Sequence, residues 1–274
     1  MAEKGVWRTI SGRRVFIGEG QTLSEAMSKS GKFGNKKVSS RKNLKLNDYR
    51  KMSVEELDRL DSKLFGMNKQ KLRDEGLNAE SRYQKLVYEL GLNDKPKVLP
   101  AKEFDRLSKG QTLVYRGVKD VSKLDSNLKI DVIKAKDIHN QMKYGDKMYV
   151  GDGSFGDGLY FTDNEGTAKR YGGDNAKNVA TAFIDSNKIK SIEFDKLSQM
   201  RQEYYSKQFE PGGKKVSSLF SDISSFALYE GYNVIIADGG FGESYYNVLD
   251  RSILVIKEEE EWKIISSQEN KLSW

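Results

Sequence analysis

Residues 151–173 read GDGSFGDGLYFTDNEGTAKRYGG. Four glycines fall within eight residues of this segment, at Gly151, Gly153, Gly156 and Gly158. The apolar run LYF predicts a strand, the polar TDN predicts a turn, and the residues after them have helical spacing. Glycine allows positive φ and lets a ligand approach the backbone, so a glycine-rich loop before a strand and a helix often lines a ligand cleft. Such a loop also occurs as a plain turn, and the segment alone leaves both interpretations open.

The composition indicates a folded chain that carries some polar, poorly packed sequence. It has 274 residues, enough for one large domain or two small ones with a sizeable core. Hydrophobic residues make up 37% of the chain and charged residues 32%, a balance that argues against disorder throughout.

Several kinds of site are excluded by residues that the sequence lacks. There are no cysteines, which excludes disulfides, thiolate metal sites and a cysteine nucleophile. His139 is the only histidine, so histidine-rich zinc sites are excluded and we expect no metal. No apolar run approaches the roughly 20 residues that span a bilayer, and the N-terminus lacks a signal-peptide core. We therefore expect a soluble protein made in a cytoplasm, with no membrane partner.

Positive charge is concentrated near the N-terminus. The net charge is +7, and residues 29–51 hold nine Lys and Arg against one acid, Asp48. Such a run can neutralise phosphates, and it also fits a solvated linker. Only Phe33 and Tyr49 interleave aromatic rings with the charges, so a stacking platform for single-stranded nucleic acid has little support.

The first part of the chain divides into three predicted pieces. Residues 1–35 contain VWRTISGRRVFI, whose alternation around a Ser-Gly turn predicts a small hairpin, and a short helix candidate, LSEAM. Residues 36–52 hold turn formers and positive charge and are predicted to be a basic, flexible linker. Residues 53–109 form a helical segment that opens with a capping box, SVEE, and contains a second amphipathic helix at 78–90, ended by Gly91.

From Gly110 the pattern changes to short strands. TLVYRGV is typical of a buried strand, and further strand-like runs are NVATAFID, KIKSIEF, YNVIIAD, YYNVLDRSILVIK and EWKIIS. Helical spacing lies between some of these runs. Residues 110–274 are therefore predicted to form an α+β domain with few helices, preceded by the helical segment.

Arg116 stands near the end of the apolar strand LVYRG and is followed by Gly117. The planar guanidinium suits a phosphate or diphosphate, and the glycine leaves room for a ligand beside the backbone. An arginine in this place can also extend from a strand edge to solvent or pair with a core carboxylate. The residue by itself does not separate these alternatives.

Three motifs in one order resemble the ADP-ribosyltransferase family. Its members carry an Arg-Gly or His-Gly strand, a Gly-x-Gly-[LI]-Tyr-Phe strand and a helix that ends in Ala-x-x-Tyr, and this chain reads YRG, GDGLYF and TAKRY. ATAFID, SNKIKSIEFDKL, a helix into GYNVII and a closing strand YYNVLDRSILVI follow as in the family. The resemblance covers residues 110–257 and implies a split β-sandwich, with two small sheets around an NAD cleft.

The resemblance also implies roles for individual residues. Arg116 would hold the ribose and diphosphate of NAD, and the backbone of Gly117 would bind the nicotinamide amide. Tyr160 and Tyr171 would frame the nicotinamide, whose cationic ring suits a tyrosine face, although core packing is the commoner role of such a tyrosine. The further cofactor-binding residues are Ser154, which also fits a plain turn, Gly158 and Phe161.

The reaction of this family breaks the bond between nicotinamide and ribose. A carboxylate near the ribose must stabilise the positive charge that develops there. The residue aligned with the family's glutamate is Tyr245, and we assign the role to Glu243, two residues earlier in GGFGESYYN. Glu230 is a poorer candidate because it ends a helix. The predicted catalytic residues are thus Glu243, Arg116 and Tyr160.

The N-terminal run GVWRTISGRRVFI and the following Gly20-Gln21 resemble a short module of phage and prophage minor head proteins. This implies a phage or prophage protein in the host cytoplasm or in the virion, where residues 29–51 would contact DNA or the portal. The sequence therefore predicts an NAD-dependent ADP-ribosyltransferase that modifies a host protein or nucleic acid. The alternative is a structural, portal-associated virion protein whose transferase-like domain is catalytically inactive, and Tyr245 at the glutamate position favours it.

Overall fold

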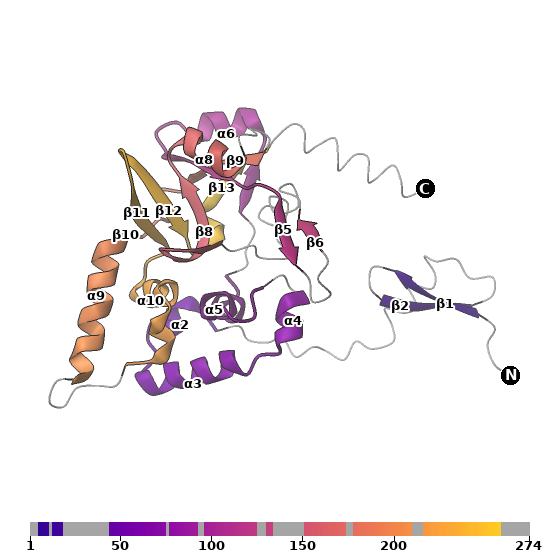
Figure 1. Ribbon diagram of the computed structural model, residues 1–274, viewed down its shortest axis with the longest axis horizontal. Helices are drawn as coiled ribbons and strands as arrows, with labels where there is room; N and C mark the ends of the chain where they lie inside the picture. The colour runs from indigo at the N-terminus through magenta and orange to yellow at the C-terminus, as the bar shows by residue number, and fades with distance from the viewer. Residues whose placement is uncertain are drawn as a thin grey trace. The chain divides into compact units, whose positions relative to one another are not determined.

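The computed structural model describes residues 5–10, 13–18, 44–74, 77–92, 96–124, 130–133, 151–173, 178–209 and 216–258 (Figure 1). The chain divides into two compact units, residues 1–43 and 44–274. The predicted helix LSEAM, most of the basic segment 29–51 and the strand-like run EWKIIS lie outside the described residues.

The first unit contains a β-hairpin. Strand β1 (Gly5–Ile10) pairs antiparallel with β2 (Arg13–Gly18), with Trp7 opposite Phe16. The alternating pattern around the Ser-Gly turn therefore predicted this hairpin correctly.

The second unit begins with four helices: α2 (Leu46–Tyr49), α3 (Val54–Phe65), α4 (Lys69–Asp74) and α5 (Arg82–Leu90). The predicted capping box is present at α3, where Ser53 Oγ accepts from the Glu56 N–H at 3.3 Å and Glu56 Oε2 accepts from the Ser53 N–H at 2.8 Å. Helix α5 begins later than predicted because Ser81 is its N-cap, and Gly91 ends it with φ 68°.

Residues 36–52 are not a linker over their whole length. Tyr49, in α2, is fully buried, and its hydroxyl donates to the Ser225 carbonyl at 2.9 Å. Arg50 Nε donates to the Leu228 carbonyl at 3.0 Å. The predicted linker therefore includes residues that belong to the folded unit. One buried ring among lysines and arginines has no periodicity that the sequence pattern could reveal.

The rest of this unit alternates strands and helices. The strands are β3 (Lys97–Leu99), β4 (Leu113–Gly117), β5 (Val121–Leu124), β6 (Ile130–Ile133), β7 (Gly151–Gly153), β8 (Gly156–Thr162), β9 (Val179–Ile184), β10 (Ser191–Glu193), β11 (Val234–Gly240), β12 (Glu243–Val248) and β13 (Leu254–Lys257). The helices are α6 (Ala101–Leu107), α8 (Glu165–Tyr171), α9 (Phe194–Ser206) and α10 (Ile223–Glu230), with the 3-10 turns η2 (Lys207–Phe209), η3 (Ser218–Ser221) and η4 (Arg251–Ile253).

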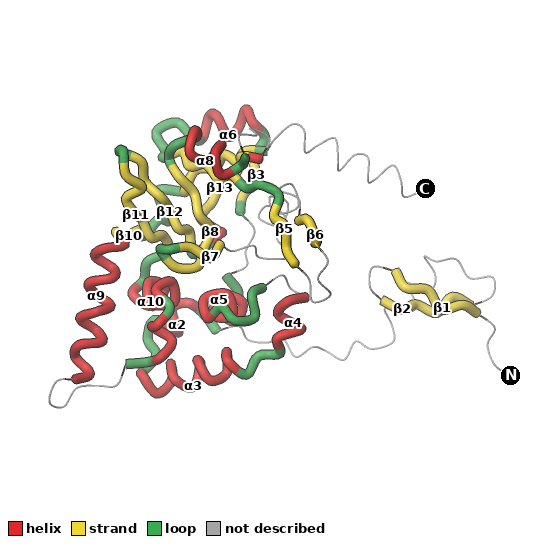
Figure 2. The backbone as a smooth tube through the Cα atoms, in the orientation of Figure 1, coloured by secondary structure: helices red, strands yellow, loops and turns green. Residues whose placement is uncertain are grey.

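Most of the strands form one mixed sheet in the order β10-β11-β12-β8-β4-β9-β13-β3, with β7 paired to β8 outside this path (Figure 2). The pairs β10–β11 and β13–β3 are parallel, and the remaining pairs are antiparallel. The two halves of the sheet meet at β4 and β8, which pair at a single position, Tyr115 with Thr162. The α+β class is therefore confirmed, and one residue pair connects the strands that the sequence predicted as two sheets.

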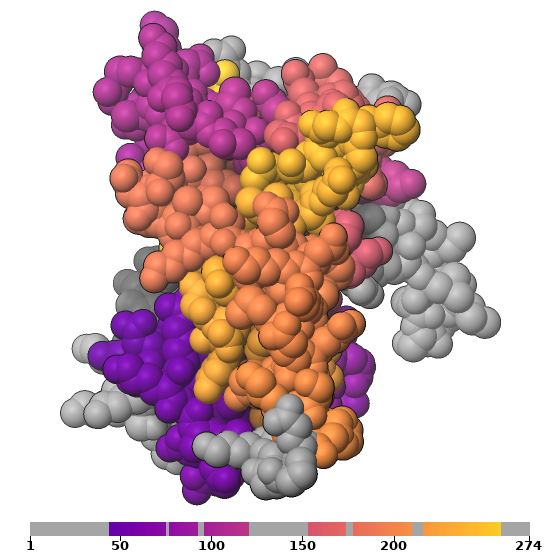
Figure 3. All heavy atoms as spheres, turned by 90° about the vertical axis from the view of Figure 1, so that its left-hand side faces the viewer, coloured from indigo at the N-terminus to yellow at the C-terminus, as the bar shows by residue number. Residues whose placement is uncertain are grey.

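A hydrophobic core joins the early helices to later elements. The leucines of α3 and the inward residues of α5 are buried, as their spacing predicted, together with Phe226 and Leu228 of α10 and Ile235 of β11. Figure 3 shows the indigo residues of the early helices directly against the orange residues of the later ones. A second core, which includes Val114 and Ile256, lies within the sheet. The predicted helical segment and the strand-rich part thus fold as one unit.

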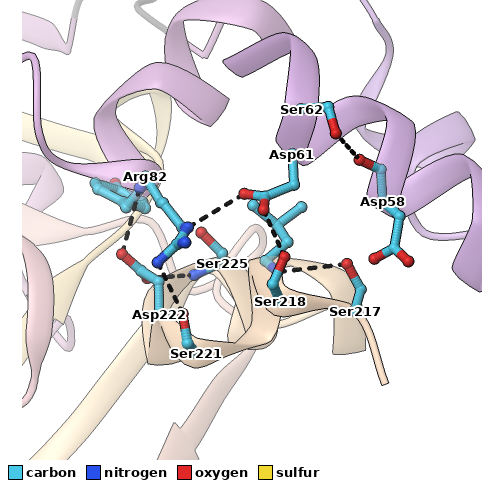
Figure 4. Close-up of polar contacts among 11 residues, drawn as sticks. Asp58, Asp61, Ser62, Arg82, Ser217, Ser218, Ser221, Asp222 and Ser225 are labelled. Carbon is cyan, nitrogen blue, oxygen red and sulfur yellow. Dashed lines mark hydrogen bonds and ion pairs between the residues drawn. The ribbon is translucent and has the colours of Figure 1, made fainter. Parts of the chain in front are cut away.

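Polar contacts also connect α3 and α5 to α10 (Figure 4). Arg82 Nε donates to Asp61 Oδ1 at 3.1 Å, which joins α5 to α3. Asp222, the N-cap of α10, accepts from the Ser225 N–H at 2.8 Å with Oδ1 and from the Tyr83 N–H at 3.3 Å with Oδ2. One carboxylate therefore serves the N-termini of both α10 and α5.

Three elements differ from the sequence-based predictions. The glycine-rich segment 151–158 forms a hairpin of β7 with β8 instead of a loop before a strand. YYNVLDRSILVIK forms two strands, because Asp250 Oδ1 accepts from the Ser252 N–H at 2.9 Å and caps the turn η4 between them. KIKSIEF contributes only the short strand β10 and leads directly into α9, a 13-residue helix that the pattern did not predict.

Candidate functional site

A pocket of about 430 Å³ lies where the two halves of the sheet meet. Both members of the joining pair, Tyr115 and Thr162, line it. The other lining residues come from β4 and the residues after it, from the β7–β8 hairpin, from α8 and from β12: they are Arg116, Gly117, Val118, Lys119, Gly153, Ser154, Phe155, Tyr160, Phe161, Ala168, Tyr171 and Tyr245. Most of the predicted site residues are therefore brought together in one place.

Arg116 borders the pocket from β4 and is 7% exposed. Its Nη1 donates to the backbone carbonyl of Tyr160 at 2.8 Å. This bond ties β4 to β8, beside the point where the two strands pair. Arg116 thus connects the two halves of the sheet and borders the pocket.

Gly117 and Gly158 are explained by packing. A Cβ at Gly117 would lie 1.7 Å from the carbonyl oxygen of Ala168, because α8 approaches β4 closely there. A Cβ at Gly158 would lie 1.7 Å from Asn247 Oδ1. Gly117 still contributes backbone to the pocket wall, whereas Gly158 does not line the pocket and its predicted role in cofactor binding is not supported.

Tyr160 closes the β7–β8 hairpin. Its hydroxyl donates to the Gly156 carbonyl and accepts from the Phe155 N–H at 3.2 Å. The ring lies over Gly153, where a Cβ would be 2.4 Å from the Tyr160 hydroxyl. Tyr160 and the exposed Ser154 both line the pocket, as predicted for ligand-binding residues, and the Tyr160 hydroxyl is already engaged in the hairpin turn.

Phe161 contributes its side chain to the core within the sheet. Its side chain is 2% exposed and belongs to the core within the sheet, with Val114 and Leu159. In strand β8, successive side chains alternate between the two faces, so Tyr160 and Phe161 face opposite ways. Phe161 therefore borders the pocket, and its side chain packs in the core within the sheet.

Tyr171 and Tyr245 lie together at the rim. Tyr171, the last residue of α8, is 58% exposed and lines the pocket, as predicted. Tyr245, in β12, also lines the pocket and stacks on Phe155, with ring centroids 6.3 Å apart and planes at 28°. Burial raises the pKa of the Tyr245 phenol far above its usual range, and hydrogen bonding with Tyr171 and the charge of Glu243 raise it further.

Glu243 lies outside this pocket, in an adjoining one. The second pocket, of about 440 Å³, is also bordered by Tyr115 and by the exposed Phe241. Glu243 Oε2 accepts from Thr167 Oγ1 at 2.6 Å, and Oε1 accepts from the Tyr245 hydroxyl at 3.2 Å. The carboxylate thus does not line the first pocket with Arg116 and Tyr160, and it is not free in solvent. A hydrogen bond joins it to Tyr245, which does line that pocket.

Sequence reasoning missed three aromatic or basic residues of the site. Tyr115 borders both pockets, Phe155 supports Tyr245, and Lys119 adds a positive charge near Arg116. The signal for Tyr115 and Lys119 was their place beside Arg116 in the run YRGVK. Phe155, at the hairpin turn, carries no such signal, because the rings that it contacts, Phe194 and Tyr245, lie far along the chain.

Hydrogen bonds from α5, α10 and β12 hold the β7–β8 hairpin, which forms one wall of the pocket. Ser81, the N-cap of α5, donates from Oγ to the Asp157 carboxylate. Ser224 Oγ of α10 donates to the Asp157 carbonyl at 2.7 Å, and Asn247 Nδ2 of β12 donates to the Phe155 carbonyl at 3.1 Å. The early helices therefore contribute to the position of the pocket wall without bordering the pocket.

Among the described residues, no cluster of three or more His, Asp or Glu side chains offers a metal site, and no helix is long and apolar enough to cross a membrane. No protein-family model, curated protein or solved structure matches this chain.

Proposed function

We propose that the pocket binds NAD and that the chain is an NAD-dependent ADP-ribosyltransferase with a split β-sandwich. The observation that carries the proposal is the shared pocket: Arg116, Ser154, Tyr160 and Tyr171 come from separate motifs and line one cavity. Its position supports the same fold, because it lies where the two halves of the sheet join through a single residue pair. A volume of about 430 Å³ falls in the range typical of small-molecule sites.

The chemistry of the lining fits a dinucleotide. Arg116 and Lys119 supply positive charge for a diphosphate, and a guanidinium can bind two of its oxygens at once. The lining tyrosines supply faces for a flat cationic ring such as nicotinamide. Arg116 and Lys119 would bind the diphosphate, and Tyr171 would bind the nicotinamide ring.

In the proposed reaction the bond between the ribose and the nicotinamide nitrogen breaks, and its electron pair leaves with nicotinamide. The anomeric carbon of the ribose becomes cationic and is attacked by a nucleophile of the acceptor, which loses its proton to solvent. A negative charge close to this carbon stabilises the transition state. We assign this charge to Glu243, which a hydrogen bond connects to Tyr245 in the pocket wall. The acceptor is a host protein or nucleic acid in a phage or prophage setting.

The test is the release of nicotinamide from NAD and the transfer of labelled ADP-ribose to host macromolecules. Arg116→Lys keeps the charge and loses the planar fork, so we expect NAD binding to weaken about 10-fold or more. Arg106→Lys, on the exposed face of α6, is the matched control and keeps wild-type binding. A wild-type protein that neither binds NAD nor releases nicotinamide contradicts the proposal.

A second function is favoured by one observation, the place of Glu243 outside the pocket lining. In this alternative the chain is a structural, portal-associated virion protein and the domain performs no chemistry. It predicts a defined copy number in purified particles and no heat of NAD binding in calorimetry. Labelling of a host acceptor by wild-type protein, lost in Glu243→Gln, would exclude it.

A further inference from the structure

Tyr245 stands between the pocket and the carboxylate. Tyr245 lines the first pocket, whereas Glu243 lines only the second. The two residues are joined by a hydrogen bond of 3.2 Å from the Tyr245 hydroxyl to Glu243 Oε1. A ligand in the first pocket therefore meets Tyr245 before it meets the carboxylate.

The hydrogen bonds around Glu243 set the direction of this contact. An ionised carboxylate only accepts, and Thr167 and Tyr245 both donate to Glu243 from their hydroxyls. Arg170 Nη2 donates to Thr167 Oγ1 at 2.6 Å, which orients the threonine proton toward Glu243. Because the single proton of Tyr245 is directed at Glu243, its oxygen acts as an acceptor toward its other partners, Tyr171 and a hydroxyl donor in the pocket.

Packing holds the phenol in this orientation. Phe155 stacks on the Tyr245 ring, with planes at 28°. On the other strand Gly239 leaves room for both side chains, since a Cβ there would lie 2.9 Å from Tyr245 Cε2 and 2.9 Å from Glu243 Cγ. A ring confined on two sides keeps its hydroxyl in place when the ligand changes charge, which is the condition for electrostatic preorganisation.

We propose that Glu243 acts on the bound dinucleotide through Tyr245, whose hydroxyl accepts a hydrogen bond from a ribose hydroxyl and carries the carboxylate's negative charge to the reacting sugar. This proposal rests on the proposed NAD-binding function. Tyr245 is then the catalytic residue that touches the ligand, and Glu243 is the positioning residue behind it. No covalent bond to Tyr245 forms and no proton leaves it, because its contribution is electrostatic.

The acid–base properties of the pair agree with this division of roles. The pKa of Tyr245 is raised, by burial first and then by its neighbours Tyr171 and Glu243. The phenol therefore keeps its proton at neutral pH and remains a donor to Glu243. A neutral phenol polarised by a carboxylate carries a larger negative charge on oxygen than an isolated phenol does.

The experiment measures nicotinamide release and NAD binding in four proteins: wild type, Tyr245→Phe, Glu243→Gln and the double variant. Tyr245→Phe removes the hydroxyl and keeps the ring on Phe155, so we expect kcat to fall about 100-fold, as for the loss of one charge-stabilising donor. Glu243→Gln should fall similarly, and the double variant should fall no further, because both substitutions break one connection. The dissociation constant for NAD, measured by calorimetry, should change less than about threefold in all variants.

Tyr246→Phe is the matched control, because the next residue of β12 points to the opposite face and packs against the core within the sheet. It should keep wild-type kcat. A Tyr245→Phe variant that turns over NAD as fast as wild type, or strictly multiplicative effects in the double variant, overturns the proposal and leaves the proposed function intact.

A charge swap provides an independent readout. Tyr245→Glu in the Glu243→Gln background places a carboxylate directly in the pocket wall, and we expect at least about a tenfold gain in kcat over Glu243→Gln alone. No gain contradicts the proposal. In ring-labelled protein the tyrosine resonance that disappears in Tyr245→Phe should also shift when NAD is added, and its constancy on NAD binding contradicts the contact. A wild-type chain that neither binds nor cleaves NAD removes the proposed function and this proposal together.

Discussion

At the scale of single residues, the glycines of the site serve the backbone of the protein before they serve a ligand. Gly117 allows α8 to reach β4, and Gly158 leaves space for the amide of Asn247. Asn247 is 1% exposed and donates to carbonyls of the hairpin turn. These hydrogen bonds form because Gly158 has no side chain in the space that the Asn247 amide occupies. These two glycines of the motifs that resemble a ligand site are thus required for close packing within the protein.

Gly117→Ala is expected to destabilise the protein by about 2–4 kcal/mol, because a Cβ 1.7 Å from the Ala168 carbonyl forces backbone of α8 to move. Urea unfolding measures the change. Gly66→Ala is the control: its Cβ would meet nothing closer than 3.6 Å, and it should change the free energy of unfolding by less than about 0.5 kcal/mol. Equal effects of the two substitutions would contradict the packing role of Gly117.

At the scale of elements, the N-terminus of α5 connects the early helices to the pocket. Ser81 caps this helix by accepting from the Gln84 N–H at 3.1 Å, and it also donates to the Asp157 carboxylate in the hairpin. A single side chain therefore serves a helix and a pocket wall. The consequence is that a residue outside the pocket affects the shape of the ligand site.

Ser81→Ala should lower both the free energy of unfolding, by about 1–2 kcal/mol, and the affinity for NAD, by about threefold or more. The matched control is Ser53→Ala, which removes the cap of α3 at an exposed position away from the pocket. It should cost about 1 kcal/mol and leave NAD affinity unchanged. Urea unfolding and calorimetry make the comparison, and equal NAD affinities in the two variants would show that the hairpin does not depend on Ser81.

Asp222 connects α5 and α10 and makes stability depend on pH. Burial raises the pKa of its carboxyl group above the usual value of 3.8, and hydrogen bonds from backbone N–H groups partly oppose this shift. Since the folded chain holds the proton more tightly than the unfolded chain, the free energy of unfolding decreases as pH rises from about 3.8 through the raised pKa.

Asp222→Asn removes this titration. The free energy of unfolding of wild type, measured relative to that of Asp222→Asn, should therefore decrease as pH increases through that window. Below the window the difference should stay constant. Urea unfolding of both proteins at a series of pH values measures the difference. If the free energy of unfolding of wild type increases relative to that of Asp222→Asn with rising pH, the sign of the pKa shift is wrong.

At the scale of the whole molecule, the early helices and the sheet share one core within residues 44–274. Tyr49 and Tyr83 anchor this core by donating to the Ser225 carbonyl at 2.9 Å and the Leu249 carbonyl at 2.8 Å. Residues 53–109 and 110–274 therefore differ in sequence pattern but do not form separate units. Each part buries hydrophobic side chains against the other.

Far-ultraviolet circular dichroism and hydrogen exchange of the sheet amides should consequently report the same unfolding midpoint in urea. Leu57→Ala, at a fully buried position of α3, should lower both midpoints equally, with a loss of about 2–5 kcal/mol. If the helical signal is lost before the sheet amides exchange, the two parts are separate cooperative units and this prediction is wrong.

Most helices and strands could be predicted from the sequence, since their signals are local. The capping box at Ser53, the glycine after Leu90 and the alternation in the first hairpin depend on residues within a few positions of each other. The helix α9 was missed because its outward face dominates its pattern: it buries only Leu197 fully. Tyr49 was missed because its partners lie in α10, far along the chain.

The sequence by itself determined the α+β class, most element positions and the order of motifs that supply Arg116, Tyr160 and Tyr171 to one pocket. Only the tertiary structure decided that Tyr245, and not Glu243, faces that pocket. The register of β11 and β12 shifts between Asp238 and Gly240, next to Glu243, and Thr167 of α8 binds the carboxylate from 76 residues away. Such a choice follows from packing between distant segments, and no local pattern of residues encodes it.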